Sequence, residues 1–188
     1  MSDRAALSSK FGATRWASHD YSSPGAYFVT ACAHQKMMIF QRPAIAAIIE
    51  QAWDELPGHF PGVMLDAFVV MPNHIHGVLI ISNGDSSSVA PQHAEALRSR
   101  APLSVIVRSF KAAVTREVRL QELWDGGRLW QPNFYDRVVR NEKELHRIRV
   151  YIANNPIAWQ FDNENPHNSA DEEYVRNWGS LENGHVEP

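Results

Sequence analysis

The sequence predicts an α+β fold, a ferredoxin-like two-layer sandwich in which helices pack on an antiparallel sheet. First, the hydrophobic patterns alternate along the chain in the order β, α, β, β, α, β, α. Second, only a short link that contains Pro72 and Asn73 separates two of these strands. A parallel pair would need a long crossover, so the short link indicates antiparallel pairing. Third, 188 residues with 44% hydrophobic side chains suit one domain with a core of its own.

The strands are predicted from β-branched and aromatic runs bounded by turn residues. Residues 26–33 (AYFVTACA) form the first run, which residues 36–40 extend or pair with. Residues 63–71 and 75–82 form the two strands of the hairpin. Residues 128–139 are expected to form the fourth strand.

The helices are predicted from apolar stripes and from the residues that start and stop them. Pro43 suits a first helical turn, and the apolar residues of 44–56 fall on one stripe. Pro102 opens a second helix that extends to about Leu120. Asn141 and Glu144 have the spacing of a capping box, which predicts a third helix that Pro156 limits.

The segments on either side of these elements are polar. Residues 1–24 are expected to be a lead-in, residues 25–160 the domain, and residues 161–188 an acidic tail. Within the domain, about residues 83–101 are poor in apolar side chains and predict a mobile loop. The sequence shows no internal repeat.

Composition excludes several classes of protein. A single cysteine, Cys32, rules out a disulfide framework and any multi-cysteine zinc site. The sequence has no apolar run of signal-peptide or membrane-span length. We therefore expect a soluble cytoplasmic protein.

The charge is unevenly distributed. Residues 97–149 contain twelve basic and six acidic side chains, whereas residues 161–188 contain seven acidic side chains and one basic one. A net charge of +6 over the first segment is compatible with a polyanionic partner. On charge alone we favour a solvated helix face with ordinary i,i+4 pairs, so charge by itself does not identify a partner.

His74 and His76 form a His-x-His motif at the start of a predicted strand. Side chains two residues apart in a strand point to the same face, so both imidazoles project together. Two neutral imidazoles at this spacing can share one divalent cation. The alternative is a pair of hydrogen-bonded histidines on a sheet face.

Tyr151 and Asn155 are four residues apart on the third predicted helix and therefore share one helical face. If that face looks onto the sheet, the phenol and the amide oxygen meet the histidine pair. Otherwise Tyr151 is a packed ring and Asn155 a helix terminus. Tyr135 is the competing tyrosine, but the residue four positions after it is Val139, which cannot ligate a metal. We therefore favour Tyr151.

Five motifs carry a resemblance to a known family. The string VVMPNHIHGVLII (residues 69–81) resembles the His-hydrophobic-His motif of single-tyrosine HUH transposases. The other four are HDYSSPGAYFVTACAHQ, LSVIVRSFKAAVT, LWQPNFYDRVVRNEKEL and RIRVYIANNPIAW. In this order, over roughly residues 19–166, they resemble the REP-associated tyrosine transposases, a domesticated bacterial branch of the insertion-sequence 200-like enzymes.

The resemblance implies roles for residues and partners. It implies that His74 and His76 are metal ligands, that Tyr151 is the nucleophile, and that Asn155 is the third ligand. It also implies Mg²⁺ or Mn²⁺ as cofactor and single-stranded DNA beside palindromic REP-type hairpins as substrate. A nucleoid-associated monomer without an obligatory protein partner is expected.

The implied reaction is attack of Tyr151 on a DNA phosphate, which leaves a 5′-phosphotyrosine and a free 3′-hydroxyl. Arg108, Lys111, Arg140 and Arg147 are our candidates for phosphate contacts, with surface salt bridges as the alternative. Trp16, Trp124 and Trp130 are candidates for stacking on unpaired bases, with burial in the core as the favoured alternative for any one of them.

Two other functions remain open. One is a domesticated hairpin-binding protein without catalytic activity. The other is an RNA-recognition sheet, which would need aromatic residues at its centre. Histidines and aliphatic residues stand there instead, so we rank this reading last.

Overall fold

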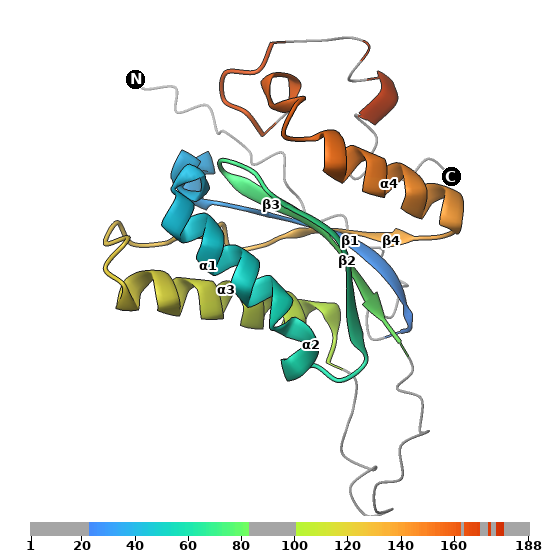
Figure 1. Ribbon diagram of the computed structural model, residues 1–188, viewed down its shortest axis with the longest axis horizontal. Helices are drawn as coiled ribbons and strands as arrows, with labels where there is room; N and C mark the ends of the chain where they lie inside the picture. The colour runs from blue at the N-terminus through green and yellow to red at the C-terminus, as the bar shows by residue number, and fades with distance from the viewer. Residues whose placement is uncertain (1–22, 83–100, 163, 170–172, 174–175, 179–188) are drawn as a thin grey trace, which may run out of the picture.

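The computed structural model describes residues 23–82, 101–162, 164–169, 173 and 176–178. These residues contain a four-stranded antiparallel sheet in the order β2-β3-β1-β4 (Figure 1). The strands are β1 (Gly25–Cys32), β2 (Val63–Val70), β3 (His74–Ile81) and β4 (Tyr135–Val139). The predicted α+β fold and the antiparallel hairpin of β2 and β3 are thereby confirmed.

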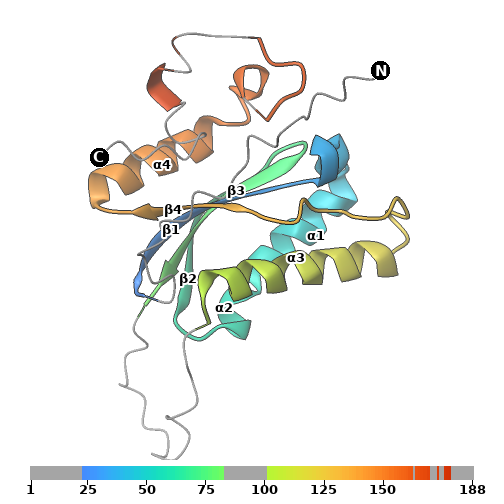
Figure 2. The ribbon, with the colours of Figure 1, turned by 180° about the vertical axis from the view of Figure 1, so that it is seen from behind.

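Helices cover both faces of the sheet (Figures 1 and 2). On one face lie α1 (Pro43–Asp54) and α3 (Leu103–Leu120), which pack against each other, with the short α2 (Leu56–His59) beside them. On the other face lies α4 (Glu142–Asn154). Its first turn is capped as predicted, because the Asn141 side chain accepts a hydrogen bond from the Glu144 amide.

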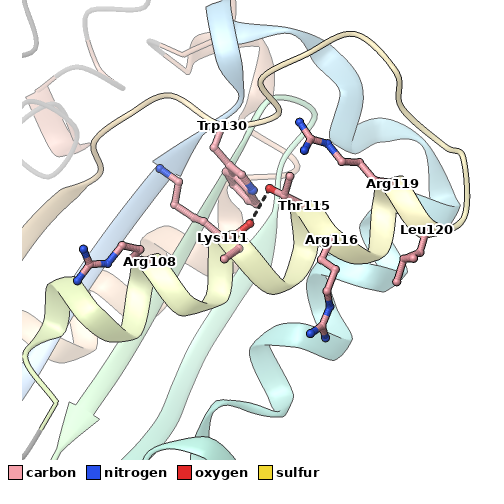
Figure 3. A pocket seen from close by; sticks show the side chains of 8 residues that line it. Arg108, Lys111, Thr115, Arg116, Arg119, Leu120 and Trp130 are labelled. Carbon is pink, nitrogen blue, oxygen red and sulfur yellow. Dashed lines mark hydrogen bonds between the residues drawn. The ribbon is translucent and has the colours of Figure 1, made fainter.

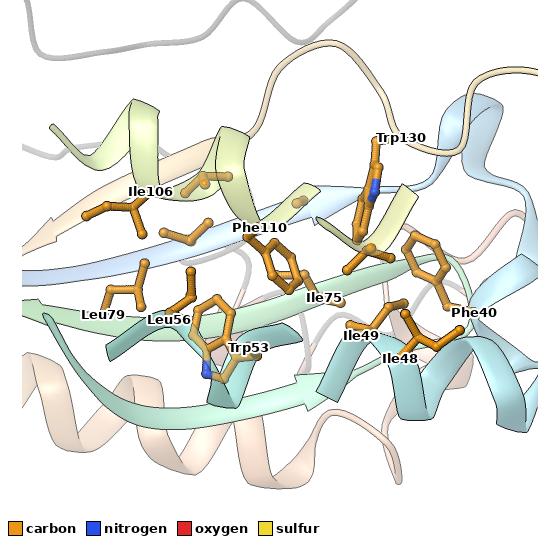
Figure 4. Packing of buried hydrophobic residues seen from close by; sticks show 14 of the residues in the cluster. Phe40, Ile48, Ile49, Trp53, Leu56, Ile75, Leu79, Ile106, Phe110 and Trp130 are labelled. Atoms are coloured by element: carbon orange, nitrogen blue, oxygen red, sulfur yellow. The ribbon is translucent and has the colours of Figure 1, made fainter. Parts of the chain in front are cut away.

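The alternation of side chains on β1 and β3 creates one core on each face. Ile75 and Leu79 of β3 pack in the larger core with α1 and α3 (Figure 4). Val78 of β3 and Phe28 of β1 pack in a smaller core with Ile148 of α4. Because the central strands are covered on both sides, α4 holds its residues against the middle of the sheet.

Two segments differ from the predicted strands. Residues 36–40 contribute to the 3₁₀ turns η1 (His34–Lys36) and η2 (Met38–Gln41), because Gln35 and Lys36 take positive φ angles of 52° and 55°. The strand predicted over 128–139 is confined to β4, preceded by an isolated bridge between Trp130 and Ala33. Pro132 lies between the bridge and β4, and proline has no amide hydrogen to donate to a neighbouring strand.

The lead-in and the loop predicted at about 83–101 fall almost wholly on residues 1–22 and 83–100, which are outside the described ranges. No helix within those ranges has the length and hydropathy needed to cross a membrane.

Gly77 allows Trp53 to approach β3 closely. A Cβ atom at Gly77 would lie 2.5 Å from two ring carbons of Trp53, and that ring is held in the core between Phe68 and Phe110. Gly77→Ala is therefore expected to lower the free energy of unfolding by about 1–3 kcal/mol, measured by urea denaturation. Gly58→Ala is the control, because a Cβ at Gly58 has no neighbour within 4 Å. Equal stability of the two variants would contradict the packing described here.

Candidate functional site

His74 and His76 point from β3 toward α4, because Ile75 and Gly77 between and after them face the other core. Both imidazoles are buried. Their Nε2 atoms lie 2.9 Å apart, and the rings are inclined at 69°. The His-x-His motif thus presents two ring nitrogens to one point, as its spacing predicts.

The tautomer of His74 follows from its neighbour Asn73. The Asn73 amide nitrogen donates to two backbone carbonyls, those of Glu164 at 2.7 Å and Lys36 at 3.3 Å. The Asn73 oxygen therefore faces Nδ1 of His74 at 2.9 Å and must accept its proton. It follows that Nε2 of His74 carries a lone pair, as a metal ligand must.

His76 is held by Thr30 of β1, whose hydroxyl lies 2.7 Å from Nδ1. A hydroxyl can donate or accept, so this contact permits either tautomer of His76. With the proton on Nε2, His76 donates to His74; with the proton on Nδ1, both Nε2 lone pairs face each other. The second arrangement is favourable when a cation lies between them.

Tyr151 comes to the histidines from α4. Its hydroxyl lies 3.1 Å from Nε2 of His76, and its ring packs edge-on against Phe28. Trp178 also lies against the Tyr151 ring, with centroids 5.8 Å apart, and Tyr151 is only 2% exposed. The predicted nucleophile is thus brought to the His-x-His motif and lies beneath other side chains.

Asn155 ends α4 one turn after Tyr151 and is 1% exposed. Neither its amide oxygen nor its amide nitrogen has a hydrogen-bond partner within the described residues. An unsatisfied buried amide costs free energy, so such a group in a native fold calls for a partner such as a water molecule or an ion. Asn155 is therefore available to a cation.

Asp162 supplies a carboxylate that the sequence analysis assigned to the acidic tail. It follows the 3₁₀ turn η4 (Trp159–Phe161), and its Oδ2 lies 3.6 Å from Nε2 of His74. Its Oδ1 accepts a hydrogen bond from the Glu164 amide, which sets the orientation of the carboxylate. Ligand atoms of His74, His76 and Asp162 all lie within 4.8 Å of one another.

These donors suit a divalent cation. Two imidazole nitrogens that bind one ion at about 2.1 Å, roughly at right angles, lie about 3 Å apart, which is close to the distance between the Nε2 atoms. Carboxylate and amide oxygens are ligands that Mg²⁺ and Mn²⁺ prefer, and imidazoles also suit Mn²⁺, Fe²⁺ and Zn²⁺. The residues present therefore fit the metal that the family resemblance implies.

Burial keeps both imidazoles neutral. Desolvation lowers the pKa of His74 well below its ordinary value, helped by His76 and Lys36, and lowers that of His76 to about 3. The contact between His74 and Asp162 therefore joins a neutral ring to a carboxylate and is not an ion pair, although its distance falls within salt-bridge range. Neutral imidazoles are the form that binds metals.

The metal-free protein is expected to lose stability as the pH falls. The unfolded histidines take up protons below about pH 6.5, whereas the folded ones remain neutral, so the unfolded state gains protons first. Between pH 7 and 5.5 the two groups together should lower the free energy of unfolding by about 2 kcal/mol. Urea denaturation with chelator measures this change. His76→Gln should remove about half of this pH dependence. If the free energy of unfolding of the variant changed with pH as that of wild type does, the assignment of His76 as a buried neutral imidazole would be contradicted.

Tyr135 lies opposite Thr30 in the pairing of β4 with β1. Burial raises the pKa of Tyr135, and the carboxylate of Glu164 raises it further. Formation of a phenolate is therefore disfavoured at Tyr135. The Tyr151 hydroxyl differs from that of Tyr135 in its contact with Nε2 of His76.

An ion pair fixes the helix that carries Tyr151. Arg149 of α4 donates to both carboxylate oxygens of Asp66, at 2.8 Å from Nε and 2.7 Å from Nη2. The Asp66 pKa is lowered by this contact. Asp66 lies at the register shift between Leu65 and Phe68 of β2. The carboxylate that binds Arg149 of α4 therefore stands at an irregularity of this edge strand.

The four basic residues predicted to contact phosphates fall into two pairs. Arg140 and Arg147 lie just before and within α4, and Arg147 donates to the backbone oxygen of Asn177. Arg108 and Lys111 lie on α3, on the other face of the sheet. Of the predicted stacking residues, Trp130 is buried at 6% exposure and Trp124 is half-buried against the larger core, while Trp16 lies outside the described ranges. Burial of the Trp130 ring agrees with the core alternative and leaves this ring unsuited to stacking.

Three residues of the site were missed by the sequence analysis. Asn73 had been read only as part of the hairpin link, and Thr30 only as part of a strand. Both lie beside histidines only after β1, β3 and their link are assembled. Asp162 had been assigned to the tail; the single available signal was its position shortly after the Asn-Pro terminator of α4.

Comparison with known proteins gives one relative of substantial identity. A Haemophilus influenzae Rd protein described as an uncharacterized protein is 35% identical over an alignment of 159 residues, which covers 77% of this chain and 87% of the relative. The chain belongs to the same family as this Haemophilus protein. No family model matches the sequence.

A solved structure shares the fold. It is a REP-associated tyrosine transposase bound to a REP hairpin, and it superposes with a TM-score of 0.53 at 21% identity. The match covers 71% of this chain and 67% of the other. The chain thus has the fold of a REP-associated tyrosine transposase, as the motifs predicted.

Proposed function

We propose that the protein is a metal-dependent single-tyrosine DNA nicking-and-joining enzyme that acts beside REP-type hairpins. One observation carries the proposal: a tyrosine hydroxyl lies 3.1 Å from a buried, neutral histidine pair whose Nε2 atoms lie 2.9 Å apart. A tyrosine and a set of residues that could hold a cation thus lie together on one face of the sheet. The fold shared with a hairpin-bound transposase supports hairpin DNA as the substrate.

His74, His76 and an oxygen of Asn155 or Asp162 are the residues that would hold the cation. When bound, a divalent cation supplies Lewis-acid stabilisation of charge on the scissile phosphate. Asn73 and Thr30 orient the two imidazoles from behind. The site is buried, so water is largely kept from these groups.

Tyr151 acts as the nucleophile. Its phenolic oxygen forms a bond to phosphorus, the bond from phosphorus to the 3′ oxygen breaks, and the net reaction moves one proton from the phenol to the leaving 3′ oxygen. A tyrosine has an ordinary pKa of about 10, so the phenol is protonated at neutral pH. Its contact with Nε2 of His76 places the hydroxyl beside the residues that would hold the cation. Rejoining is the reverse reaction, in which a 3′-hydroxyl of DNA attacks the phosphotyrosine and releases the tyrosine. It needs no nucleotide cofactor.

The test is a gel assay for a covalent protein–DNA adduct. Hairpins drawn from the host's repeats, with a single-stranded flank labelled at the 5′ or 3′ end, are incubated with Mg²⁺, Mn²⁺ or chelator. An adduct that needs metal and carries the 3′ fragment is expected. Absence of an adduct with every metal and every host repeat would contradict the proposed activity.

A second candidate is a hairpin-binding protein that does not cleave. The low exposure of Tyr151, beneath Trp178, favours it, because a phosphate cannot reach the hydroxyl unless neighbouring side chains move. Hairpin binding without an adduct in the same assay would establish this candidate.

Two oxygen ligands compete for the cation, and single substitutions distinguish them. If Asp162 is a ligand, Asp162→Asn should weaken Mn²⁺ binding more than about tenfold in isothermal titration, because an anionic ligand is lost. Asn155→Ala should then have the smaller effect. The reverse order would assign the ligand to Asn155, as the family resemblance implies.

A further inference from the structure

A basic groove lies on the outer side of α3, on the face of the sheet opposite α4 (Figure 3). It has a volume of about 650 Å³ and is bounded by α3 and by the indole of Trp130. Arg108, Lys111, Arg116 and Arg119 line it, together with Thr115 and Leu120. Arg108, Lys111, Thr115 and Arg119 recur at helical spacing and form one stripe along α3, with Arg116 on its flank.

The positive charge of this groove is not neutralised by the described part of the chain. No acidic side chain lines the groove. None of the salt bridges found among the described residues involves its four basic side chains. Arg108 and Arg119 are eleven residues apart, about 16 Å along the helix, which is long enough for several successive phosphates.

Lys111 is built into the floor of the groove. Its ammonium donates to the backbone oxygens of Gln131 at 2.5 Å and Asn133 at 3.0 Å, and lies 5.8 Å from the centre of the Trp130 ring. Burial lowers the Lys111 pKa to about 8. A half-buried cation with only neutral acceptors is stabilised by an incoming anion.

The backbone segment at the floor of the groove is hydrogen-bonded to the strand that lies beside His74. The Gln131 amide donates to the backbone oxygen of Cys32 at 2.9 Å. Cys32 in turn pairs with His74 in the register of β1 and β3. The segment that carries Trp130 and Gln131 therefore joins the groove to the end of the sheet where the histidines lie.

We propose that the α3 groove, defined by Arg108, Lys111, Arg116 and Arg119, binds the phosphodiester backbone of the single-stranded DNA that flanks the hairpin. This inference rests on the proposed function, since it assigns a subsite to the same substrate. Charge complementarity selects a polyanion, and the length of the stripe selects a chain of phosphates. Arginine side chains along one helix face contact phosphates without reading sequence.

The position of the groove favours a single strand over a duplex. A strand that passes His74 and Tyr151 must turn around the end of the sheet to enter the groove on the other face. Duplex DNA is stiff over about 150 base pairs, so this turn would be costly for a duplex. A single strand can make the turn and remain bound along both faces.

The test measures binding of two labelled DNAs, a hairpin with its single-stranded flank and the same hairpin without it. Anisotropy titrations over a range of salt concentrations compare wild type with Arg108→Ala/Arg116→Ala, whose substituted side chains are both exposed. For the flanked hairpin, affinity should fall about tenfold or more, and the slope of log K against log salt should lessen by about 0.7 for each lost phosphate contact. For the hairpin without its flank, the variant should bind as wild type does.

Lys143→Ala is the control for loss of charge, because Lys143 is exposed in the first turn of α4 on the other face. Its effect should be the same with and without the flank. The proposal would be overturned if Arg108→Ala/Arg116→Ala left the slope of log K against log salt unchanged. It would also be overturned if this variant lost affinity equally for the two DNAs. The binding titrations do not depend on cleavage, so they decide the subsite even if wild type forms no adduct.

Discussion

Tyr151→Phe is expected to abolish the covalent protein–DNA adduct, with a loss of at least about 1000-fold, because the phenolic oxygen that bonds to phosphorus is absent. The ring contacts with Phe28, His76 and Trp178 do not need the hydroxyl, so the fold should be retained. Hairpin affinity should stay within about threefold of wild type, since Tyr151 is buried and contributes little surface to DNA. A denaturing gel measures the adduct, and anisotropy measures the affinity.

Tyr135→Phe is the matched control. It removes the hydroxyl of a tyrosine near the same end of the sheet, where β4 pairs with Thr30. This variant should keep at least about a third of the wild-type adduct. Loss of the adduct in Tyr135→Phe but not in Tyr151→Phe would mean that the nucleophile is Tyr135.

His76→Ala is expected to have the second largest effect, because His76 contacts both His74 and Tyr151. Removal of its imidazole takes away a ligand of the proposed cation and the group that the Tyr151 hydroxyl contacts. Mn²⁺ affinity should fall more than about 100-fold in isothermal titration, and the adduct yield should fall to the level seen with chelator. Cleavage that survives both the substitution and the chelator would contradict the metal site.

Thr30→Val provides a graded comparison for His76→Ala. It preserves the shape of the Thr30 side chain but removes the hydroxyl that lies 2.7 Å from Nδ1 of His76. Loss of such a supporting group should weaken Mn²⁺ binding by about 10- to 100-fold, less than loss of the imidazole. His76→Gln, which fills more of the space beside Phe28 than alanine does, separates loss of the ligand from loss of packing.

The two faces of the sheet have different roles in the proposed reaction. The face toward α4 holds the histidines, Tyr151 and Asp162, and it is closed by buried side chains. The face toward α1 and α3 holds the larger core, and the α3 groove lies along its outer edge. Cleavage and strand retention are therefore assigned to different faces, so variants of one can be tested without disturbing the other.

Local sequence patterns determined much of the fold and part of the candidate site. The alternation of His74, Ile75 and His76 indicated that both imidazoles share a face, and the structure places them 2.9 Å apart at Nε2. The spacing of Tyr151 and Asn155 indicated a shared helical face, and both are buried in the structure. These inferences depend only on the periods of strands and helices, which are properties of neighbouring residues.

Tertiary structure decided the rest, because the contacts concerned join residues far apart in sequence. Thr30 and Asn73 orient the histidines only once β1 lies beside β3 and Asn73 donates to the backbone oxygen of Glu164, and no local pattern encodes that assembly. Asp162 lies 88 positions after His74 and approaches it only because the chain turns back through η4. The basic stripe of α3 was visible in the sequence, but the groove is formed only where Trp130 and the carbonyl groups of Gln131 and Asn133 pack against Lys111. Periodicity predicts which face a side chain takes, whereas the partner on that face depends on how the whole chain folds.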